Sequence, residues 1–263
     1  MTTPPFRDVI RSRLGAIMRN PIRLPNVTCA VCTVPIEDRY TLCYRCSQDS
    51  KGPVPVARRV VPLTYAFSGH QSNTDMHHYK DPMPEWFRPQ NPSFQRVQLL
   101  LLGFTVTHAG CLDRVGSRPV TRLTSVPSLG GRTGLHPLGG LREVLPKRWR
   151  RFDLLPRTGI PAEERRLVRP DHFVLADPSE VAGYHVVVLE DTWVQGGHAQ
   201  SAAATILQAG AAEVTILVIA RRIGDQAGRS LIERLLSASL RRAVEYNVDI
   251  CPVTGGACPP ASR

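Results

Sequence analysis

The stretch "VVVLEDTWVQGGHAQSAA", residues 186–203, places an apolar run, two acids, a glycine pair and an alanine-rich segment in order. The apolar run shows no polar alternation, which is typical of a strand buried on both faces of a parallel sheet. Glu190 and Asp191 should lie where the strand emerges from the core, because an unpaired buried charge is costly. The alanine-rich segment predicts a helix that packs close to the sheet and ends at Gly210. An ordinary strand, turn and helix would show the same order of residues.

The rest of the chain continues this alternation of apolar strands and helices. Strands are expected over 60–67, 120–127, 172–176 and 214–220, and helices over 6–18, 94–106 and 230–246. Residues 136–151 predict a short helix with a basic end. We therefore expect an α/β fold whose mostly parallel sheet is flanked by helices.

The loop after the two acids combines features of a phosphate-binding site. In open α/β sheets, ligands bind in the crevice at the carboxyl ends of the strands. Paired glycines allow the backbone to approach a ligand closely, and the helix that follows offers free amide groups and the positive end of its dipole. The candidate phosphate-binding residues are Val194, Gln195, Gly196, Gly197 and His198.

Four cysteines near the start of the chain have the spacing of a zinc site. Cys29-x2-Cys32 is followed after ten residues by Cys43-x2-Cys46, and each pair can place two thiolates on one ion. Four protein ligands leave no open position, so we expect a structural Zn²⁺ that holds a segment too small to fold on its own core. Free or disulfide-paired cysteines are the alternative interpretation.

The strand, acids, glycine loop and small-residue helix resemble the phosphoribosyl pyrophosphate (PRPP) signature of type I phosphoribosyltransferases. A four-cysteine zinc ribbon ahead of such a domain is similar to the ComF family, whose members are linked to DNA uptake in competent bacteria. "HHYKDP", residues 77–82, is similar to a Lys-Tyr element found early in those domains. The resemblance implies a type I phosphoribosyltransferase-like fold preceded by a small zinc ribbon with four cysteine ligands.

The resemblance also assigns roles to individual residues. Glu190 and Asp191 would be the catalytic acids that bind the ribose hydroxyls and help to position Mg²⁺, and the amides of residues 194–198 would hold the 5′-phosphate. The family usually has hydroxyl residues where this chain has Val194, Gln195 and His198, so His198 would donate a ring proton to phosphate instead. The pyrophosphate loop would lie within residues 126–134, where its candidates are Ser128, Leu129, Gly130, Gly131 and Arg132.

These features suggest a division of the chain into four segments. We expect a basic amphipathic helix over 1–25, the zinc ribbon over 26–52, a phosphoribosyltransferase-like domain over 60–250 and a tail over 251–263. Cys111 is expected in the core, whereas Cys251 and Cys258 receive no role. No apolar stretch is long enough to cross a bilayer and no signal peptide is visible, so we expect a cytoplasmic protein without membrane insertion.

The charge distribution suits phosphate-bearing partners, but thirty of the basic residues are Arg, which the codon bias of a high-G+C genome would also produce. The chain has 33 Lys and Arg against 22 Asp and Glu, and the basic excess lies in the first 180 residues. The first functional hypothesis is transfer of the phosphoribosyl group of PRPP to an acceptor that no motif specifies, with release of pyrophosphate. The second is a non-catalytic accessory protein that binds single-stranded DNA through the ribbon and "PKRWRR", residues 146–151. The third is a regulator that senses PRPP or a nucleotide without turnover; each is compatible with a homo-oligomer.

Overall fold

The computed structural model describes residues 5–130, 137–225, 227, 229–231, 233 and 245–260. Its central sheet has the strand order β1-β7-β6-β2-β3, and every neighbouring pair is parallel. The strands of this sheet are β1 (Arg59–Phe67), β2 (Val120–Ser125), β3 (Arg150–Arg151), β6 (His185–Trp193) and β7 (Glu213–Ile223). The α/β class and the mostly parallel sheet expected from the sequence are confirmed.

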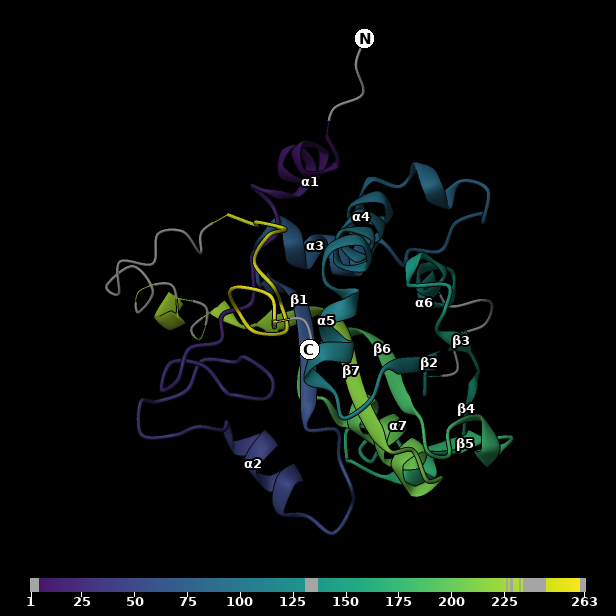
Figure 1. Ribbon diagram of the computed structural model, residues 1–263. Coiled ribbons are helices and arrows are strands. Elements are labelled where there is room, and N and C mark those ends of the chain that lie inside the picture. Colours follow the sequence, from purple (N-terminus) through teal and green to yellow (C-terminus); the bar gives the residue numbers. More distant parts are fainter. Residues whose placement is uncertain are drawn as a thin grey trace.

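Seven α-helices are assigned in the described residues (Figure 1). They are α1 (Phe6–Leu14), α2 (Tyr44–Lys51), α3 (Gln71–His78), α4 (Pro92–Thr107), α5 (Ala109–Val115), α6 (Pro137–Leu141) and α7 (Gly197–Gln208). Short 3₁₀ turns occur at η1 (Arg88–Gln90), η2 (Arg142–Val144), η3 (Pro170–His172) and η4 (Pro178–Glu180). None of the helices in the described part of the chain is long and apolar enough to cross a bilayer.

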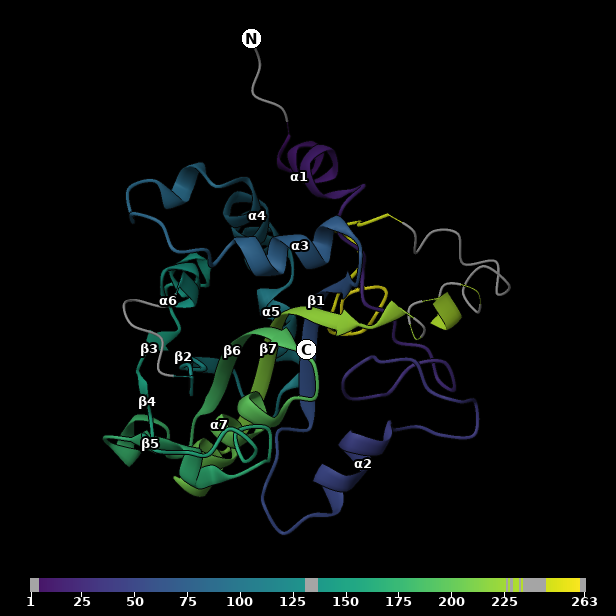
Figure 2. The same cartoon turned by 180° about the vertical axis from the view of Figure 1, so that it is seen from behind.

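The sheet has an apolar core on each face. Val187 and Leu189 of β6 belong to the cluster that contains buried side chains of α1, α3 and α4, whereas Val186 and Val188 belong to the cluster of α7 and the N-terminal cysteines. Helices α3 and α4 lie toward the top of Figure 1 and α7 toward the bottom, and the view from behind in Figure 2 keeps this separation. Because successive strand residues face opposite cores, β6 needs apolar side chains at every position, which explains the unbroken apolar run.

The long helix α4 begins where its sequence provides a cap. The side chain of Asn91 accepts hydrogen bonds from the amides of Ser93 and Phe94, and Pro92 occupies the first helical position. The helix then buries Val97, Leu100, Leu101 and Phe104 against the sheet.

Several elements differ from the sequence-based expectations. The strand at 172–176 is β5 (Phe173–Leu175), which pairs antiparallel with β4 (Leu154–Pro156) outside the central sheet. The described part of the segment 136–151, which starts at Pro137, does not form one helix, because α6 and η2 are followed by β3, which adds an edge strand to β2. The N-terminal helix ends at Leu14, before the expected residue 18. The helix expected over 230–246 falls mostly outside the described residues.

Candidate functional site

A pocket of about 360 Å³ opens at the carboxyl ends of β6 and β7. It is lined by residues 190–199, which contain the end of β6, the following loop and the start of α7. Arg166 and Arg222 complete the lining, and both side chains are exposed. Its volume and its place at the strand ends are those of a small-molecule site in an open α/β sheet. The sequence did not point to either arginine.

Strand β6 continues past the two acids instead of ending at them. It pairs with β7 through Trp193, whose side chain is only 2% exposed and belongs to the apolar core. Trp193 therefore anchors the end of the strand, and Glu190 and Asp191 lie half-buried just before it. The acids face the pocket from a rigid strand rather than from a loop.

Asp191 is held by two residues of the segment that follows α3. Its Oδ2 accepts hydrogen bonds from Lys80 Nζ at 2.9 Å and from Tyr79 Oη at 3.0 Å. Burial opposes ionisation of Asp191, but Lys80 and Tyr79 outweigh it and hold the pKa of this carboxyl below its ordinary value. The "HHYKDP" element thus contacts the acid pair directly, although the two segments lie far apart in the sequence.

Glu190 has the opposite electrostatic character. Burial and the neighbouring Asp191 charge raise its pKa well above the ordinary value. Its Oε1 accepts a hydrogen bond from the Asp191 amide at 3.0 Å. The site therefore places a carboxyl group whose ionised form is favoured beside one whose protonated form is favoured, and a bound cation would favour ionisation of the second.

The glycine pair in the loop is required by the packing of the chain itself. Gly196 has φ +84°, and a Cβ at this position would clash with the Trp193 ring. A Cβ on Gly197 would clash with the Arg166 carbonyl oxygen. The two glycines allow the Trp193 ring and the Arg166 backbone to pack against the start of α7, so their lack of a side chain shapes the pocket.

The start of α7 offers backbone donors to the pocket. The amide of Gln200 makes the first hydrogen bond of the helix, to Gly196 O at 2.8 Å. The amides of residues 197–199 precede that bond, and these residues line the pocket. Free amides together with the helix dipole favour an anionic group at this position.

The side chains around the loop differ in their access to the pocket. Val194 is 51% exposed and Gln195 is also exposed. His198 is half-buried, and its Nε2 is buried without a hydrogen-bond partner among the described residues. Burial and the adjacent His172 lower the pKa of His198, so the ring is neutral at pH 7 and can donate only one ring proton.

Part of the expected pyrophosphate loop lies at the same edge of the sheet. Residues 128–130 follow β2, which neighbours β6, and the Val126 amide extends that pairing with a bond to Leu189 O at 3.0 Å. Ser128 Oγ accepts a hydrogen bond from the Gly130 amide at 3.2 Å, whereas Leu129 is buried in the core. Leu129 therefore anchors the loop by packing, and Gly131 and Arg132 lie outside the described residues.

Arg221 connects this pocket to the cysteine cluster. It is 5% exposed and donates to the carbonyl oxygens of Trp193 at 2.8 Å, Val194 at 3.0 Å and Cys32 at 3.1 Å. A buried guanidinium that is satisfied by main-chain oxygens fixes the path of both segments. Its neighbour Arg222 points the other way along the strand alternation and remains exposed at the pocket.

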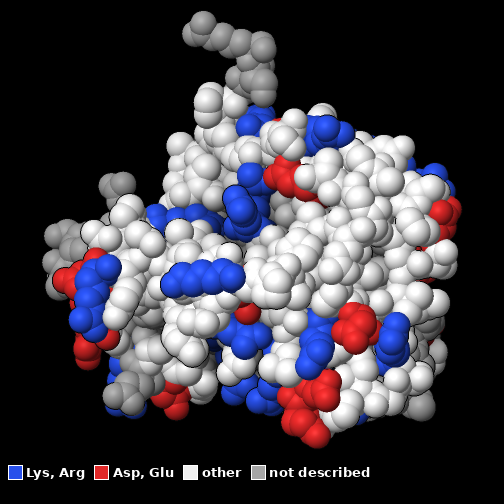
Figure 3. Space-filling view, turned by 90° about the horizontal axis from the view of Figure 1, so that it is seen from below, with Lys and Arg blue, Asp and Glu red and all other residues white. Residues whose placement is uncertain are grey.

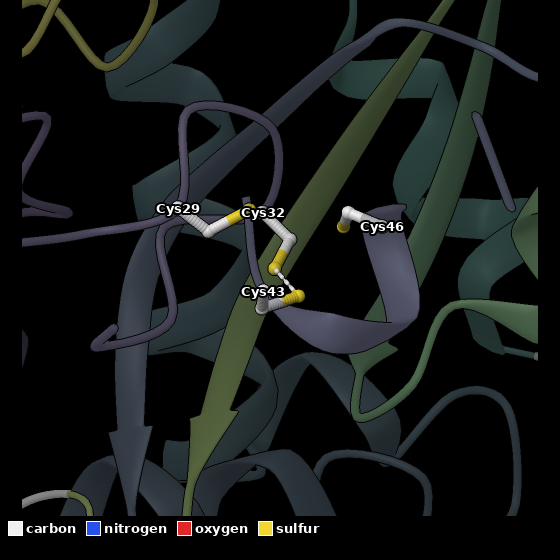
Figure 4. A group of neighbouring side chains, drawn as sticks. All are labelled: Cys29, Cys32, Cys43 and Cys46. Atoms are coloured by element: carbon white, nitrogen blue, oxygen red, sulfur yellow. Dashed lines mark hydrogen bonds between the residues drawn. The ribbon is translucent and has the colours of Figure 1, made fainter. Parts of the chain in front are cut away.

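The four N-terminal cysteines converge in space (Figure 4). Their sulfur atoms all lie within 4.8 Å of one another, with Cys32 and Cys43 3.7 Å apart. Cys29 and Cys32 come from a turn in which Thr33 has φ +59°, whereas Cys43 and Cys46 come from the start of α2. Two sulfurs of a tetrahedral zinc site lie about 3.8 Å apart at a Zn–S distance of about 2.3 Å. The cluster is therefore suited to a metal ion such as zinc.

The electrostatics of the cluster favour a cation. Contacts with the other thiols lower the pKa of Cys29 and raise the pKa of Cys46. Four thiolates within 4.8 Å of one another would repel, so a compensating positive charge favours their ionisation. A divalent metal supplies that charge and binds thiolates. Most of this cluster is buried in the same core as Trp193, so a bound metal would also support the sheet.

Comparison of the chain with protein-family models, with curated proteins and with solved structures finds no match.

Proposed function

We propose that this chain binds PRPP, or a related ribose 5-phosphate, together with Mg²⁺ at the carboxyl ends of β6 and β7, and that it transfers the phosphoribosyl group. The observation that carries the proposal is the acid pair, in which Asp191 is kept ionised by Lys80 and Tyr79 while the pKa of Glu190 is raised. This pair lines the same pocket as the first amides of α7. A ribose phosphate has both groups that such a pocket would recognise, a phosphate and vicinal hydroxyls.

Each end of the ligand has a chemically suitable partner. The amides of residues 197–199 would bind the 5′-phosphate, as helix starts do in many phosphate sites. The carboxyl groups of Glu190 and Asp191 would accept hydrogen bonds from the ribose hydroxyls. Oxygen ligands suit Mg²⁺, and the raised pKa of Glu190 means that a cation would release its proton.

The transfer itself requires cleavage of the bond between the anomeric carbon and pyrophosphate. The electron pair leaves with pyrophosphate, the lone pair of the acceptor forms the new bond to that carbon, and the acceptor releases its proton to water. Bound Mg²⁺ would offset the charge of the leaving pyrophosphate. Arg166 and Arg222 are exposed at the pocket and can stabilise the same charge.

The nucleic-acid hypothesis receives less support from the surface. Within "PKRWRR", Trp149 is fully buried, Arg148 pairs with Asp113 at 2.7 Å, and Arg150 pairs with Glu180 at 2.7 Å. Figure 3 shows Lys and Arg interspersed with Asp and Glu on the face that it presents. Two arginines of this segment are therefore already paired with acids, and the ribose-phosphate pocket is the better-supported function.

Isothermal titration calorimetry with PRPP and Mg²⁺ tests the proposal. We expect binding by the wild type, at least about tenfold weaker binding by Asp191→Asn, and unchanged binding by Asp153→Asn, which alters an exposed acid that pairs with Arg142. Circular dichroism and thermal unfolding would verify that the Asp191→Asn variant is folded. Absence of binding by the wild type would overturn the proposal.

A second measurement separates transfer from sensing. Pyrophosphate release is followed with PRPP, Mg²⁺ and a panel of bases and amines as acceptors. Release that Asp191→Asn abolishes supports a transferase. Binding without release for any acceptor would instead assign the pocket to a ligand-sensing protein.

A further inference from the structure

A second group of metal-binding side chains is separate from the pocket and from the N-terminal cysteines. It consists of His108, Cys111, Cys251 and Cys258, whose ligand atoms all lie within 4.8 Å of one another. His108 is at the junction of α4 and α5 and Cys111 is in α5, whereas the two other cysteines belong to the C-terminal segment. His108, Cys111 and Cys251 are buried, and Cys258 closes the group from the solvent side.

The orientation of His108 is fixed by a main-chain contact. Its Nε2 lies 2.6 Å from the carbonyl oxygen of Val248. A carbonyl oxygen can only accept, so Nε2 carries a proton and donates it, and Nδ1 is the ring nitrogen left to face an ion. That Nδ1 lies 3.4 Å from Cys258 Sγ. Metal-binding histidines characteristically use one ring nitrogen for the ion and donate the other to a carbonyl or carboxylate.

The C-terminal segment contains a tight turn between its two cysteines, Cys251 and Cys258. Cys251 and Gly256 form an antiparallel bridge, with the Cys251 amide 2.8 Å from Gly256 O. Gly255 turns the chain with φ +81° and donates to Cys251 O at 2.7 Å. The tight turn brings Cys258 back toward Cys251, as the turns of paired-cysteine zinc sites do.

Other contacts hold this segment against α5 and against the chain that follows α1. Asn20 Nδ2 donates to Asn247 O at 2.9 Å, Arg23 Nε donates to Pro252 O at 2.9 Å, and Arg114 Nη1 donates to Pro259 O at 3.0 Å. The segment lies beside α5 in both ribbon views (Figures 1 and 2). The four ligands therefore converge on a scaffold that is also defined by hydrogen bonds outside the cluster.

We propose that His108 Nδ1 and the sulfur atoms of Cys111, Cys251 and Cys258 bind a second zinc ion. In a tetrahedral site with Zn–S of about 2.3 Å and Zn–N of about 2.0 Å, a sulfur and a nitrogen ligand are about 3.5 Å apart. The observed Cys258–His108 separation of 3.4 Å fits this geometry. Four protein ligands leave no open position, so the ion is structural.

The second ion would hold the C-terminal segment on the α4–α5 junction. Its ligands come from two parts of the chain that are separated by about 140 residues, as their numbers show. Closing so long a loop restricts the unfolded chain, which stabilises the folded state. The site thus supports the face of the sheet that α1, α3 and α4 cover, whereas the N-terminal cysteines support the face that α7 covers.

Zinc content of the full-length protein tests the inference. The protein is purified without chelators, and zinc is measured by mass spectrometry after removal of loosely bound metal by gel filtration. We expect two zinc ions per chain in the wild type and one in Cys258→Ser. We also expect one in Cys46→Ser, which removes a ligand of the N-terminal cluster, and two in the control Thr254→Ala, which changes the same turn without removing a ligand.

Cobalt substitution of the wild type provides a test that needs no variant. The visible spectrum should contain two components, one typical of four sulfur ligands and one, at shorter wavelength, typical of three sulfurs and one nitrogen. Cys258→Ser should lose the second component alone. A wild type with at most one zinc that Cys258→Ser retains, or a disulfide between Cys251 and Cys258 in the native protein shown by peptide mapping, would overturn the inference.

Discussion

The parallel strands of the central sheet start at one side, here called the amino edge, and end at the other, the carboxyl edge. Buried acids are paired with protein groups to different extents at these two edges. The amino edge has the larger hollow, about 950 Å³, which is lined by Arg59 and Glu213 at the starts of β1 and β7. There Glu213 pairs with Arg59 and accepts bonds from the amide and hydroxyl of Ser117 at 2.7 and 2.8 Å. The carboxyl edge has the smaller pocket of about 360 Å³, in which no ion pair to Glu190 occurs among the described residues.

The pKa values of the two glutamates express this difference. Burial opposes ionisation of Glu213, but Ser117 and Arg59 outweigh it and hold its pKa below the ordinary value. Burial and Asp191 raise the pKa of Glu190 well above it. The amino edge satisfies its acid with protein groups, whereas the carboxyl edge leaves an acid for a ligand or cation to satisfy. A buried carboxyl group without an ion-pair partner therefore identifies the candidate site better than the volume of the cavity does.

The largest effect should come from the buried cation at the carboxyl edge. Arg221→Met removes the donor to the carbonyls of Trp193, Val194 and Cys32 and leaves those of Trp193 and Cys32 buried without it. We expect a loss of about 3 kcal/mol in the free energy of unfolding, because each lost bond to a charged group costs about 1–3 kcal/mol. Urea unfolding of the metal-loaded protein measures it.

The neighbouring residue supplies a matched control. Arg222→Met alters an exposed side chain at the pocket, so the free energy of unfolding should change by less than about 0.5 kcal/mol while PRPP binding weakens. Equal destabilisation by both substitutions would contradict the view that Arg221 supports the edge and Arg222 serves the ligand.

The sequence predicted the parts of the molecule that depend on local patterns. The apolar run of 186–189 identified β6, and the spacing of Cys29, Cys32, Cys43 and Cys46 identified a cluster that the fold brings together. Both signals are short-range, because strand burial and paired-cysteine turns involve residues that are close along the chain.

The parts that depend on tertiary packing could not be predicted. Lys80 contacts Asp191 only because β1 and β6 are held in one sheet with β7 between them. Arg221 and Arg222 are adjacent and identical in type, and only the strand alternation separates a buried donor from a pocket residue. His108 and Cys251 are likewise unrelated along the chain, so their cluster required the structure.

An intermediate effect is expected at the amino edge. Glu213→Gln replaces a carboxylate that accepts from Ser117 and Arg59, so the free energy of unfolding should fall by about 2 kcal/mol at pH 7. The folded pKa of Glu213 is depressed, so its contribution is present above the unfolded pKa of about 4.3 and is lost as pH falls through the folded value.

Urea unfolding as a function of pH measures this dependence. The difference between the wild type and the Glu213→Gln variant should be largest near neutrality and should shrink below about pH 4, where the carboxyl becomes protonated in both states. A difference that does not depend on pH would attribute the loss to side-chain geometry rather than to the charge of Glu213.

The smallest effect, and one of opposite sign, is expected from Glu190→Gln at the carboxyl edge. Because the folded pKa of Glu190 is raised, its protonated form favours folding below the unfolded pKa of about 4.3, and that contribution is lost as pH rises toward the folded value. Glutamine does not titrate, so the variant should gain about 1 kcal/mol over the wild type at pH 8 and nothing at about pH 4. The same variant should lose the thermal stabilisation that Mg²⁺ with PRPP gives the wild type. Destabilisation by Glu190→Gln at pH 8 comparable to that by Glu213→Gln would mean that protein groups stabilise the ionised carboxylate at both edges. The proposed difference between an amino edge that supports the fold and a carboxyl edge that binds a ligand would then be wrong.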